Sequence, residues 1–124
     1  MMGQAVLVAG GMLQCSHGGT LRLQSGDARM TAGGMDVVTA TMEIGLSFAP
    51  GAPGVLVPCP FLSPSSAPSP CAATLAASAG MAQATRIGGQ AVLLADARGQ
   101  ATNPNDPGAS WSVLDAGQTV VTSS

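Results

Sequence analysis

The sequence predicts a mainly β domain of short hairpins with a proline-rich loop and at most one short helix. The chain's 17 glycines and 9 prolines make up 26 of its 124 residues, and both residue types disfavour helix interiors. Glycine pairs recur beside segments rich in valine, leucine and threonine, which is the pattern of turns that join strands. Only 8% of the residues are charged, about a third of the usual share. We expect one domain spanning residues 1–124.

The first quarter of the chain reads as two strands. In residues 5–9 the two valines, Val6 and Val8, share one face, and residues 20–24 place two leucines on one face. Between them, Cys15 and His17 are two positions apart. In an extended segment this spacing projects both side chains to the same face.

The next hairpin is predicted around Gly33-Gly34. Glycine adopts positive φ without steric cost, so this pair suits a tight turn. Strands are expected on either side of it, over residues 30–32 and residues 35–44.

The middle of the chain contains most of the prolines. Residues 50–70 include seven prolines, and Cys59 lies between two of them. On its own, such a tract would be a linker or a disordered segment. Because cysteines lie within it and directly after it, we expect a metal to supply its order. Ser69-Pro70 resembles the start of a helix, and we predict a short helix over residues 71–79. The helix dipole would then favour the thiolate of Cys71.

The last third returns to strands. We predict a hairpin with strands over residues 85–87 and 90–95, joined at Gly88-Gly89. Residues 103–108 form a turn-rich loop. A final pair of strands is expected over residues 111–115 and 118–122.

Charge and hydropathy exclude several classes of protein. The net charge of −2, with only four basic residues, argues against nucleic-acid binding and against electrostatic attachment to anionic membranes. The first basic residue, Arg22, follows the apolar run over residues 5–9, so we do not expect a signal peptide. Residues 44–85 are uncharged but too rich in proline for a transmembrane helix. We therefore expect synthesis in a reducing cytoplasm, where cysteines favour metal over disulfides.

The candidate site consists of Cys15, His17, Cys59 and Cys71, which are all the cysteine and histidine residues in the chain. Three thiolates and one imidazole match the ligands of a closed structural zinc site; iron is the alternative metal. Two other interpretations remain open. The cysteines could be small buried apolar groups, or Cys15 could be a nucleophile with His17 as its base. A catalytic Cys15–His17 pair needs a third group to orient the histidine, and no carboxylate lies nearby in the sequence.

Three stretches resemble PAAR-like proteins, the spike tips of contractile injection systems such as type VI secretion and extracellular phage-tail-like particles. They are Met12-Leu13-Gln14-Cys15-Ser16-His17-Gly18-Gly19, Pro58-Cys59-Pro60 and Thr85-Arg86-Ile87-Gly88-Gly89-Gln90-Ala91-Val92-Leu93. The resemblance runs from about Gly3 to Val121. Family members often bind their metal mainly through histidine, whereas here three cysteines would do so.

The resemblance implies a small conical domain whose point is ordered by zinc. It would be a structural tip rather than an enzyme, capping a trimeric spike related to VgrG and phage tail-tip proteins and helping it penetrate the target envelope. Its membrane contact would be transient. The chain would remain cytoplasmic until assembled on the particle and then be ejected. Repeated Gly-Gly hairpins suggest that one copy meets the three-fold spike. The alternatives are an adaptor for effector cargo and a thiol enzyme using Cys15.

Overall fold

The computed structural model describes residues 4–123. Of the predicted domain, residues 1–3 and Ser124 lie outside the described residues; the first of these groups includes Gly3, where the resemblance begins. The described residues contain strands and no helix, so the mainly β prediction is confirmed. The strands are β1 (Gln4–Ala5), β2 (Met12–Cys15), β3 (Thr20–Arg22), β4 (Asp27–Ala32), β5 (Met35–Val37), β6 (Val55–Val57), β7 (Ala73–Ile87), β8 (Gln90–Thr102), β9 (Ser110–Asp115) and β10 (Thr122–Ser123). In this part of the chain there is accordingly no helix of a length and apolarity that could cross a membrane.

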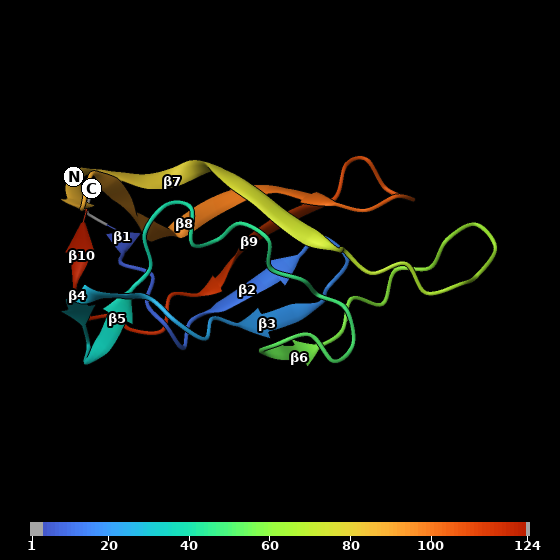
Figure 1. Cartoon of the computed structure of the whole chain (residues 1–124), viewed down its shortest axis with the longest axis horizontal. Helices are drawn as coiled ribbons and strands as arrows, with labels where there is room; N and C mark the ends of the chain where they lie inside the picture. The colour runs from blue at the N-terminus through green and yellow to red at the C-terminus, as the bar shows by residue number, and fades with distance from the viewer. Residues whose placement is uncertain (1–3, 124) are drawn as a thin grey trace.

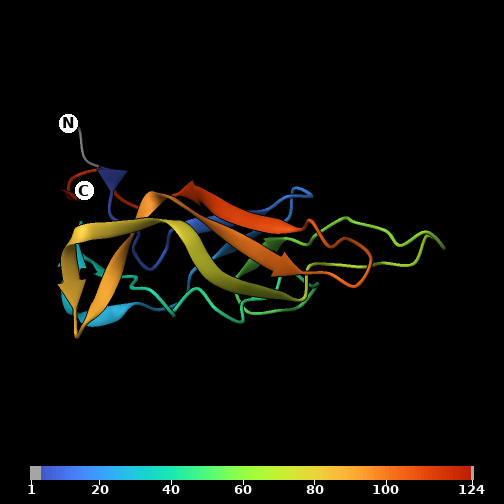
Figure 2. The same cartoon turned by 90° about the horizontal axis from the view of Figure 1, so that it is seen from above.

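Antiparallel pairing organises these strands into three sheets. Six strands form the main sheet in the order β6-β3-β2-β9-β8-β7, and two small sheets pair β1 with β10 and β4 with β5. The main sheet runs along the long axis of the molecule, as Figures 1 and 2 show.

The two ends of this elongated molecule differ. β1, β10, β4, β5 and the β7–β8 turn lie at one end, which we call the blunt end (Figure 1). The opposite end carries the turn over residues 16–19, the proline-rich loop over residues 58–72 and the loop over residues 103–109. The proline-rich loop projects beyond the sheets there (Figures 1 and 2), so we call this the narrow end.

Both predicted glycine turns are confirmed. Gly33 and Gly34 join β4 to β5 with φ of 59° and 84°, and Gly88 and Gly89 join β7 to β8 with φ of 57° and 84°. Positive φ at both central positions is the geometry of a tight hairpin turn, which glycine adopts without strain.

The helix predicted over residues 71–79 is wrong, because most of this segment belongs to β7. Ala73 pairs with Thr102, and Ala77 pairs with Gly99. A Cβ at Gly80 would lie 2.1 Å from the Cα of Ala97, so the two strands approach closely at this point. Pairing with β8, the next strand of the hairpin, therefore overrides the helix preference of an alanine-rich sequence.

Four of the predicted strands are shorter than expected. The strand predicted over residues 20–24 ends at Arg22, as β3. In the segment over residues 5–9, β1 ends at Ala5, and only single bridges continue from Val6 and Val8. In the segment over residues 35–44, β5 ends at Val37. Of residues 118–122, only the last lies in β10.

Side-chain hydrogen bonds replace strand pairing in two of these places. The buried Glu43 accepts a hydrogen bond on Oε2 from the Ala77 amide at 2.8 Å, in a turn beyond β5. Near the C-terminus, Nε2 of the Gln118 side chain donates to the backbone carbonyls of Val6 and Val121 at 2.8 and 2.9 Å. Such bonds satisfy the backbone where sequence periodicity alone suggested more strand.

The apolar core consists of two clusters. The larger one includes all three cysteines, and its biggest buried side chains are Trp111 and Phe48. The smaller one belongs to the blunt end and consists of Val6, Val8, Ala32, Val37, Ala82, Ile87, Val92 and Leu94. The larger core thus extends up to the candidate site.

Candidate metal centre

The structure brings the four predicted ligands together. One ligand atom from each of Cys15, His17, Cys59 and Cys71 lies within 4.8 Å of the others. His17 Nδ1 is 3.5 Å from Sγ of Cys59 and 3.5 Å from Sγ of Cys71. The two sulfurs of Cys59 and Cys71 are 3.9 Å apart, and all three cysteines are free rather than disulfide-bonded.

These separations match a tetrahedral metal site. With Zn–S bonds of about 2.3 Å and Zn–N bonds of about 2.0–2.1 Å, a tetrahedron places sulfur about 3.8 Å from sulfur and about 3.6 Å from nitrogen. The observed values for Cys59, Cys71 and His17 are 3.9 and 3.5 Å. Cys15 supplies the fourth donor within 4.8 Å of the others, so this set could hold a metal ion such as zinc.

We had expected Cys15 and His17 to share one face of a strand, and this expectation is wrong. Cys15 is the last residue of β2, and His17 lies in the turn that follows. The turn is closed by hydrogen bonds from the Cys15 amide to the Gly19 carbonyl and from the Gly18 amide to the Cys15 carbonyl, at 2.9 and 3.0 Å. The reversal of the chain at this turn, rather than the alternation of a strand, brings the imidazole to the thiol.

Gly19 gives this turn room to approach the proline-rich loop. A Cβ at Gly19 would lie 2.8 Å from the Cα and 2.9 Å from the nitrogen of Cys59. The Gly19 amide also donates to Sγ of Cys15 at 3.2 Å. An N–H directed at sulfur favours a thiolate.

Cys59 and Cys71 reach the site from segments outside the strands. The Cys59 amide donates to the Phe48 carbonyl at 3.0 Å, and the Phe48 amide donates to the Cys71 carbonyl at 3.1 Å. The buried Phe48 thus fixes both cysteines from one backbone position. Because no helix begins at Cys71, the expected effect of a helix dipole on its thiolate does not operate.

Burial acts on the pKa values of all three thiols and sets the direction of the shift at two of them. It raises the pKa of Cys15, and burial together with the neighbouring sulfurs of Cys15 and Cys59 raises the pKa of Cys71 to about 12. Burial acts in the same direction on Cys59, but hydrogen bonds, first from the Phe61 and Cys71 amides, outweigh it and lower the pKa of Cys59. A bound metal cation would reverse the cost of placing several thiolates together, since a coordinated thiol loses its proton.

Asp106 and Phe61 also contact His17, and no sequence pattern indicated either contact. His17 Nε2 lies 2.6 Å from Asp106 Oδ2, and Phe61 stacks on the imidazole with ring centroids 4.2 Å apart. Burial lowers the pKa of His17, but hydrogen bonds to Asp106 and Cys59 outweigh it and raise the pKa above its ordinary value. The bond to His17 also holds the pKa of Asp106 below its usual value.

Asn103 is a third residue near the centre that the sequence did not indicate. Its side-chain amide donates to the Ser69 carbonyl at 2.8 Å and lies 3.9 Å from Sγ of Cys71. In the sequence, residues 103–108 appeared only as a turn-rich loop. Contacts of this kind join positions more than thirty residues apart, so local pattern carries no signal of them.

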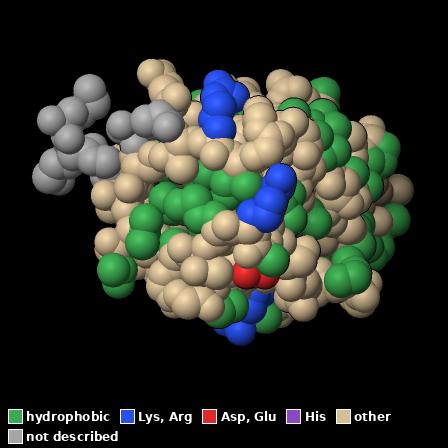
Figure 3. Space-filling view, turned by 60° about the vertical axis from the view of Figure 1, so that its left-hand side comes forward, with side chains coloured by type: hydrophobic (Ala, Val, Ile, Leu, Met, Phe, Trp, Pro, Cys, Tyr) green, Lys and Arg blue, Asp and Glu red, His purple; other side chains and the backbone are tan. Residues whose placement is uncertain are grey.

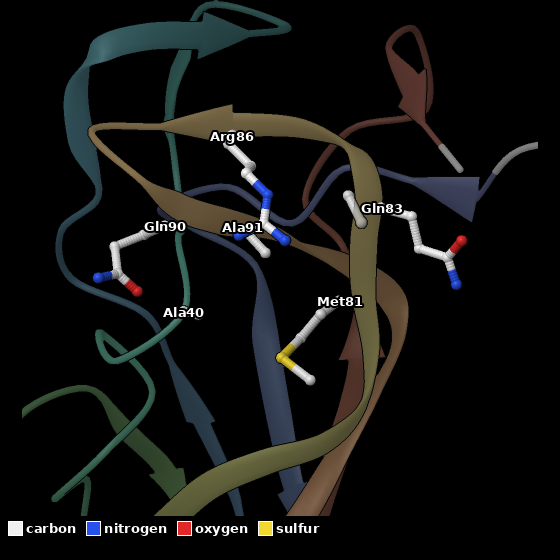
Figure 4. A pocket seen from close by; sticks show the side chains of 7 residues that line it. Ala40, Met81, Gln83, Arg86, Gln90 and Ala91 are labelled. Carbon is white, nitrogen blue, oxygen red and sulfur yellow. The ribbon is translucent and has the colours of Figure 1, made fainter.

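A separate pocket of about 420 Å³ lies at the blunt end. Its lining residues are Ala40, Met81, Ala82, Gln83, Arg86, Gln90 and Ala91. Figure 4 shows Arg86 and Met81 extending into the opening framed by β7 and β8. The opening forms where the β7–β8 register shifts between Met81 and Arg86. Figure 3 shows apolar side chains at this end of the molecule with arginine side chains beside them.

Comparisons with protein-family models, curated proteins and solved structures find no match to this chain. The geometry of the site and the positions of the two ends therefore carry the functional argument.

Proposed function

We propose that the chain binds one structural zinc ion through Cys15, His17, Cys59 and Cys71, and that it caps the trimeric spike of a contractile injection system. The observation that carries this proposal is the set of three thiols and one imidazole gathered at the narrow end of an elongated β molecule. Three sulfurs and one imidazole nitrogen fill a tetrahedron, so no coordination position remains for a substrate or an activated water. Such a site contributes stability rather than chemistry.

The location of the site supports a role as a tip. The four donors and the proline-rich loop lie at the narrow end, opposite the described ends of the chain (Figures 1 and 2). A structural zinc contributes folding free energy directly. In this role it would stiffen the segment that meets the target envelope first, while the blunt end faces the spike.

The blunt end offers features that suit a three-fold partner. Three two-stranded units lie there: β1 with β10, β4 with β5, and the end of the β7–β8 hairpin (Figure 1). A trimeric spike presents three equivalent ends, and a single chain can meet them only with three comparable surfaces. The apolar area in Figure 3 would be covered in such a contact. We therefore propose one copy of this chain per spike trimer.

The thiol-enzyme alternative has one observation in its favour, because His17 is oriented by Asp106 as a catalytic base would be. Against it, the exposed fractions of Cys15, Cys59 and Cys71 are 3%, 7% and 0%. A nucleophile must be reachable by its substrate. An alkylation time course on native protein separates the two functions: rapid labelling of Cys15 alone supports the enzyme, and protection of all three cysteines until a chelator is added supports the metal site.

Elemental analysis of purified protein tests the metal directly. We expect one zinc per chain, and an equal amount of iron would instead reassign the metal. Protein purified without any bound metal, and unable to take up zinc after reduction of its thiols, would refute the metal site.

Stoichiometry tests the spike proposal. An affinity tag inserted among the exposed residues 64–66 would leave the blunt end unmodified. Native mass spectrometry of the complex captured through this tag should give one copy of this chain for three copies of the spike protein. Three copies per trimer, or no spike protein in the captured material, would overturn the proposal. An effector retained in the same complex would identify the chain as a cargo adaptor in addition.

A further inference from the structure

We propose that Asp106 is a positioning residue for the metal centre, and that it fixes which nitrogen of His17 faces the metal. This inference rests on the proposed metal site. The two nitrogens of the ring have separate partners: Nε2 lies 2.6 Å from Asp106 Oδ2, and Nδ1 lies 3.5 Å from the sulfurs of Cys59 and Cys71. A carboxylate accepts a proton donor, so Nε2 carries the hydrogen and the lone pair of Nδ1 is directed at the metal.

The loop that carries Asp106 holds this carboxylate in a defined orientation. Asp106 Oδ1 accepts a hydrogen bond from the Gly108 amide at 3.0 Å, which leaves Oδ2 for His17. The Asp106 amide donates to the Asn103 carbonyl at 3.1 Å. The two oxygens of the carboxylate therefore have different tasks, one within the loop and one toward the ligand.

Asn103 anchors the same loop to the proline-rich segment. Its Oδ1 accepts hydrogen bonds from Ser69 Oγ at 3.0 Å and from the Asn105 amide at 2.9 Å. Its Nδ2 donates to the Ser69 carbonyl two residues before Cys71. One loop thus supports two of the four donors, His17 through Asp106 and Cys71 through Asn103.

Phe61 holds the plane of the imidazole, and Asp106 holds its Nε2 edge. The Phe61 ring stacks on the imidazole at an interplanar angle of 24°, and Asp106 bonds to Nε2. Turning the ring to present Nε2 to the metal would break the bond to Asp106. The side chain of His17 is only 14% exposed, so water does not readily replace that bond.

The substitution Asp106→Asn tests this role while preserving the loop. The amide oxygen of the new side chain can still accept the Gly108 hydrogen bond, but its NH₂ group then faces the N–H of His17. Two donors oppose each other, so the orienting bond is lost. Loss of such an outer partner typically weakens metal binding by about 10–100-fold. We expect that loss in a competition titration of the purified protein with zinc and a chromophoric chelator.

Asp115→Asn is the matched control. Asp115 Oδ1 accepts a hydrogen bond from the Gly117 amide at 2.8 Å, the same local turn as in Asp106, but no histidine is bonded to it. We expect its zinc affinity to equal that of the unmodified protein. An equal loss of affinity in both variants would overturn the inference, since it would assign the effect to the turn.

A nitrogen-15 NMR measurement on the unmodified, zinc-loaded protein needs no variant. We expect His17 to appear as a single tautomer with zinc on Nδ1 and hydrogen on Nε2. Coordination through Nε2 would overturn the inference, as would unchanged affinity in Asp106→Asn. If the unmodified protein binds no zinc at all, the proposed metal site fails and this inference fails with it. If the unmodified protein binds zinc and Asp106→Asn binds it equally well, this inference fails but the proposed metal site stands.

Discussion

The two ends of the molecule are ordered by different interactions. At the blunt end, paired strands enclose an apolar cluster in which Val6, Val8, Val37 and Val92 are fully buried. At the narrow end, turns and loops meet around sulfur and imidazole donors, and side-chain hydrogen bonds replace strand pairing. The blunt end is thus held by strand pairing around the smaller cluster, whereas at the narrow end a candidate metal site lies beside the larger cluster and joins the loops.

This difference has an energetic consequence. Fully burying a valine contributes about 1.5–3 kcal/mol, so the blunt end is stabilised by many modest contributions. The narrow end gathers three buried thiols, and burial together with the neighbouring sulfurs raises the pKa of Cys71 to about 12. A metal cation beside these sulfurs would favour their ionised form. Its order should therefore depend on one large contribution, which a metal provides. The experiments below test that contrast, from the largest expected effect to the smallest.

Removing one ligand should have the largest effect. Cys71→Ala or Cys59→Ala should release the metal and lower the melting temperature sharply. Zinc binding contributes about 10–16 kcal/mol in small zinc-finger peptides, against total stabilities of about 5–15 kcal/mol. Calorimetry and elemental analysis of the variants measure both quantities. A variant that keeps the original melting curve would refute the metal site.

Leu94→Ala provides the comparison at the blunt end. Leu94 is 5% exposed in the smaller cluster, and truncating a buried leucine costs about 2–5 kcal/mol. We expect a lower melting temperature but one zinc per chain, as in the unmodified protein. Loss of zinc from this variant would mean that the two ends are not independent.

Metal removal should affect the narrow end first. After addition of a chelator, the amides of Cys59 and Ser69 should lose hydrogen-exchange protection, because their acceptors lie in segments joined by the site. The Leu93 amide, bonded to the Val38 carbonyl, should remain protected. Trp111 is opposite Cys15 in the β2–β9 pair, so its fluorescence should report the opening. Equal loss of hydrogen-exchange protection at all three amides would contradict the idea that the two ends are ordered separately.

The features predicted from the sequence are those with a local signal. The turns at Gly33-Gly34 and Gly88-Gly89 depend on the glycines themselves, and the candidate donors could be identified because Cys and His are rare in this chain. The strand-rich class followed from glycine and proline content. Each of these inferences needs only residue type and immediate neighbours.

The features that the sequence did not predict depend on distant partners. Residues 71–79 resemble a helix by composition, but β8 supplies the pairing that makes them a strand. The carboxylate that His17 lacks locally is supplied by Asp106, 89 residues along the chain. Cys15 and His17 do meet, although through a turn rather than a strand. Topology decides such contacts, and one sequence does not reveal it.

A smaller effect is expected from added methyl groups at glycine. In Gly19→Ala the new Cβ would press on the Cys59 backbone at 2.8 Å, which should displace a ligand and weaken zinc binding. In Gly34→Ala nothing lies within 4 Å, but φ is +84°, and such strain costs about 1–2 kcal/mol. Chelator competition and thermal melting should therefore separate the variants. Equal zinc affinities in the two would show that the site tolerates movement of Cys59.

The smallest effect concerns the ion pair of the β4–β5 hairpin. Asp27 and Arg29 approach to 2.6 Å, and the hydrogen bond from Arg29 holds the pKa of Asp27 at about 2. The ordinary value is about 3.9. A carboxyl with a depressed pKa stabilises the fold above its unfolded pKa, and this contribution disappears as the pH falls from about 4 to about 2. Because the Arg29 side chain of this pair is 64% exposed, we expect only a slight, salt-sensitive change in melting for Asp27→Asn at neutral pH.

The titration of Asp27 nevertheless provides a sensitive test of whether the blunt end holds without metal. Protons compete with metal for thiolate and imidazole ligands, so acid should release zinc well before Asp27 is protonated. If the blunt end stays folded, NMR of metal-free protein should still give a midpoint of about 2 for Asp27. If loss of metal unfolds the whole chain, the midpoint should rise to about 3.9. Arg29→Gln is the control, since it should raise the midpoint even while the hairpin remains folded. A midpoint of about 3.9 in unsubstituted, metal-free protein would therefore mean that the apolar cluster cannot hold the blunt end alone.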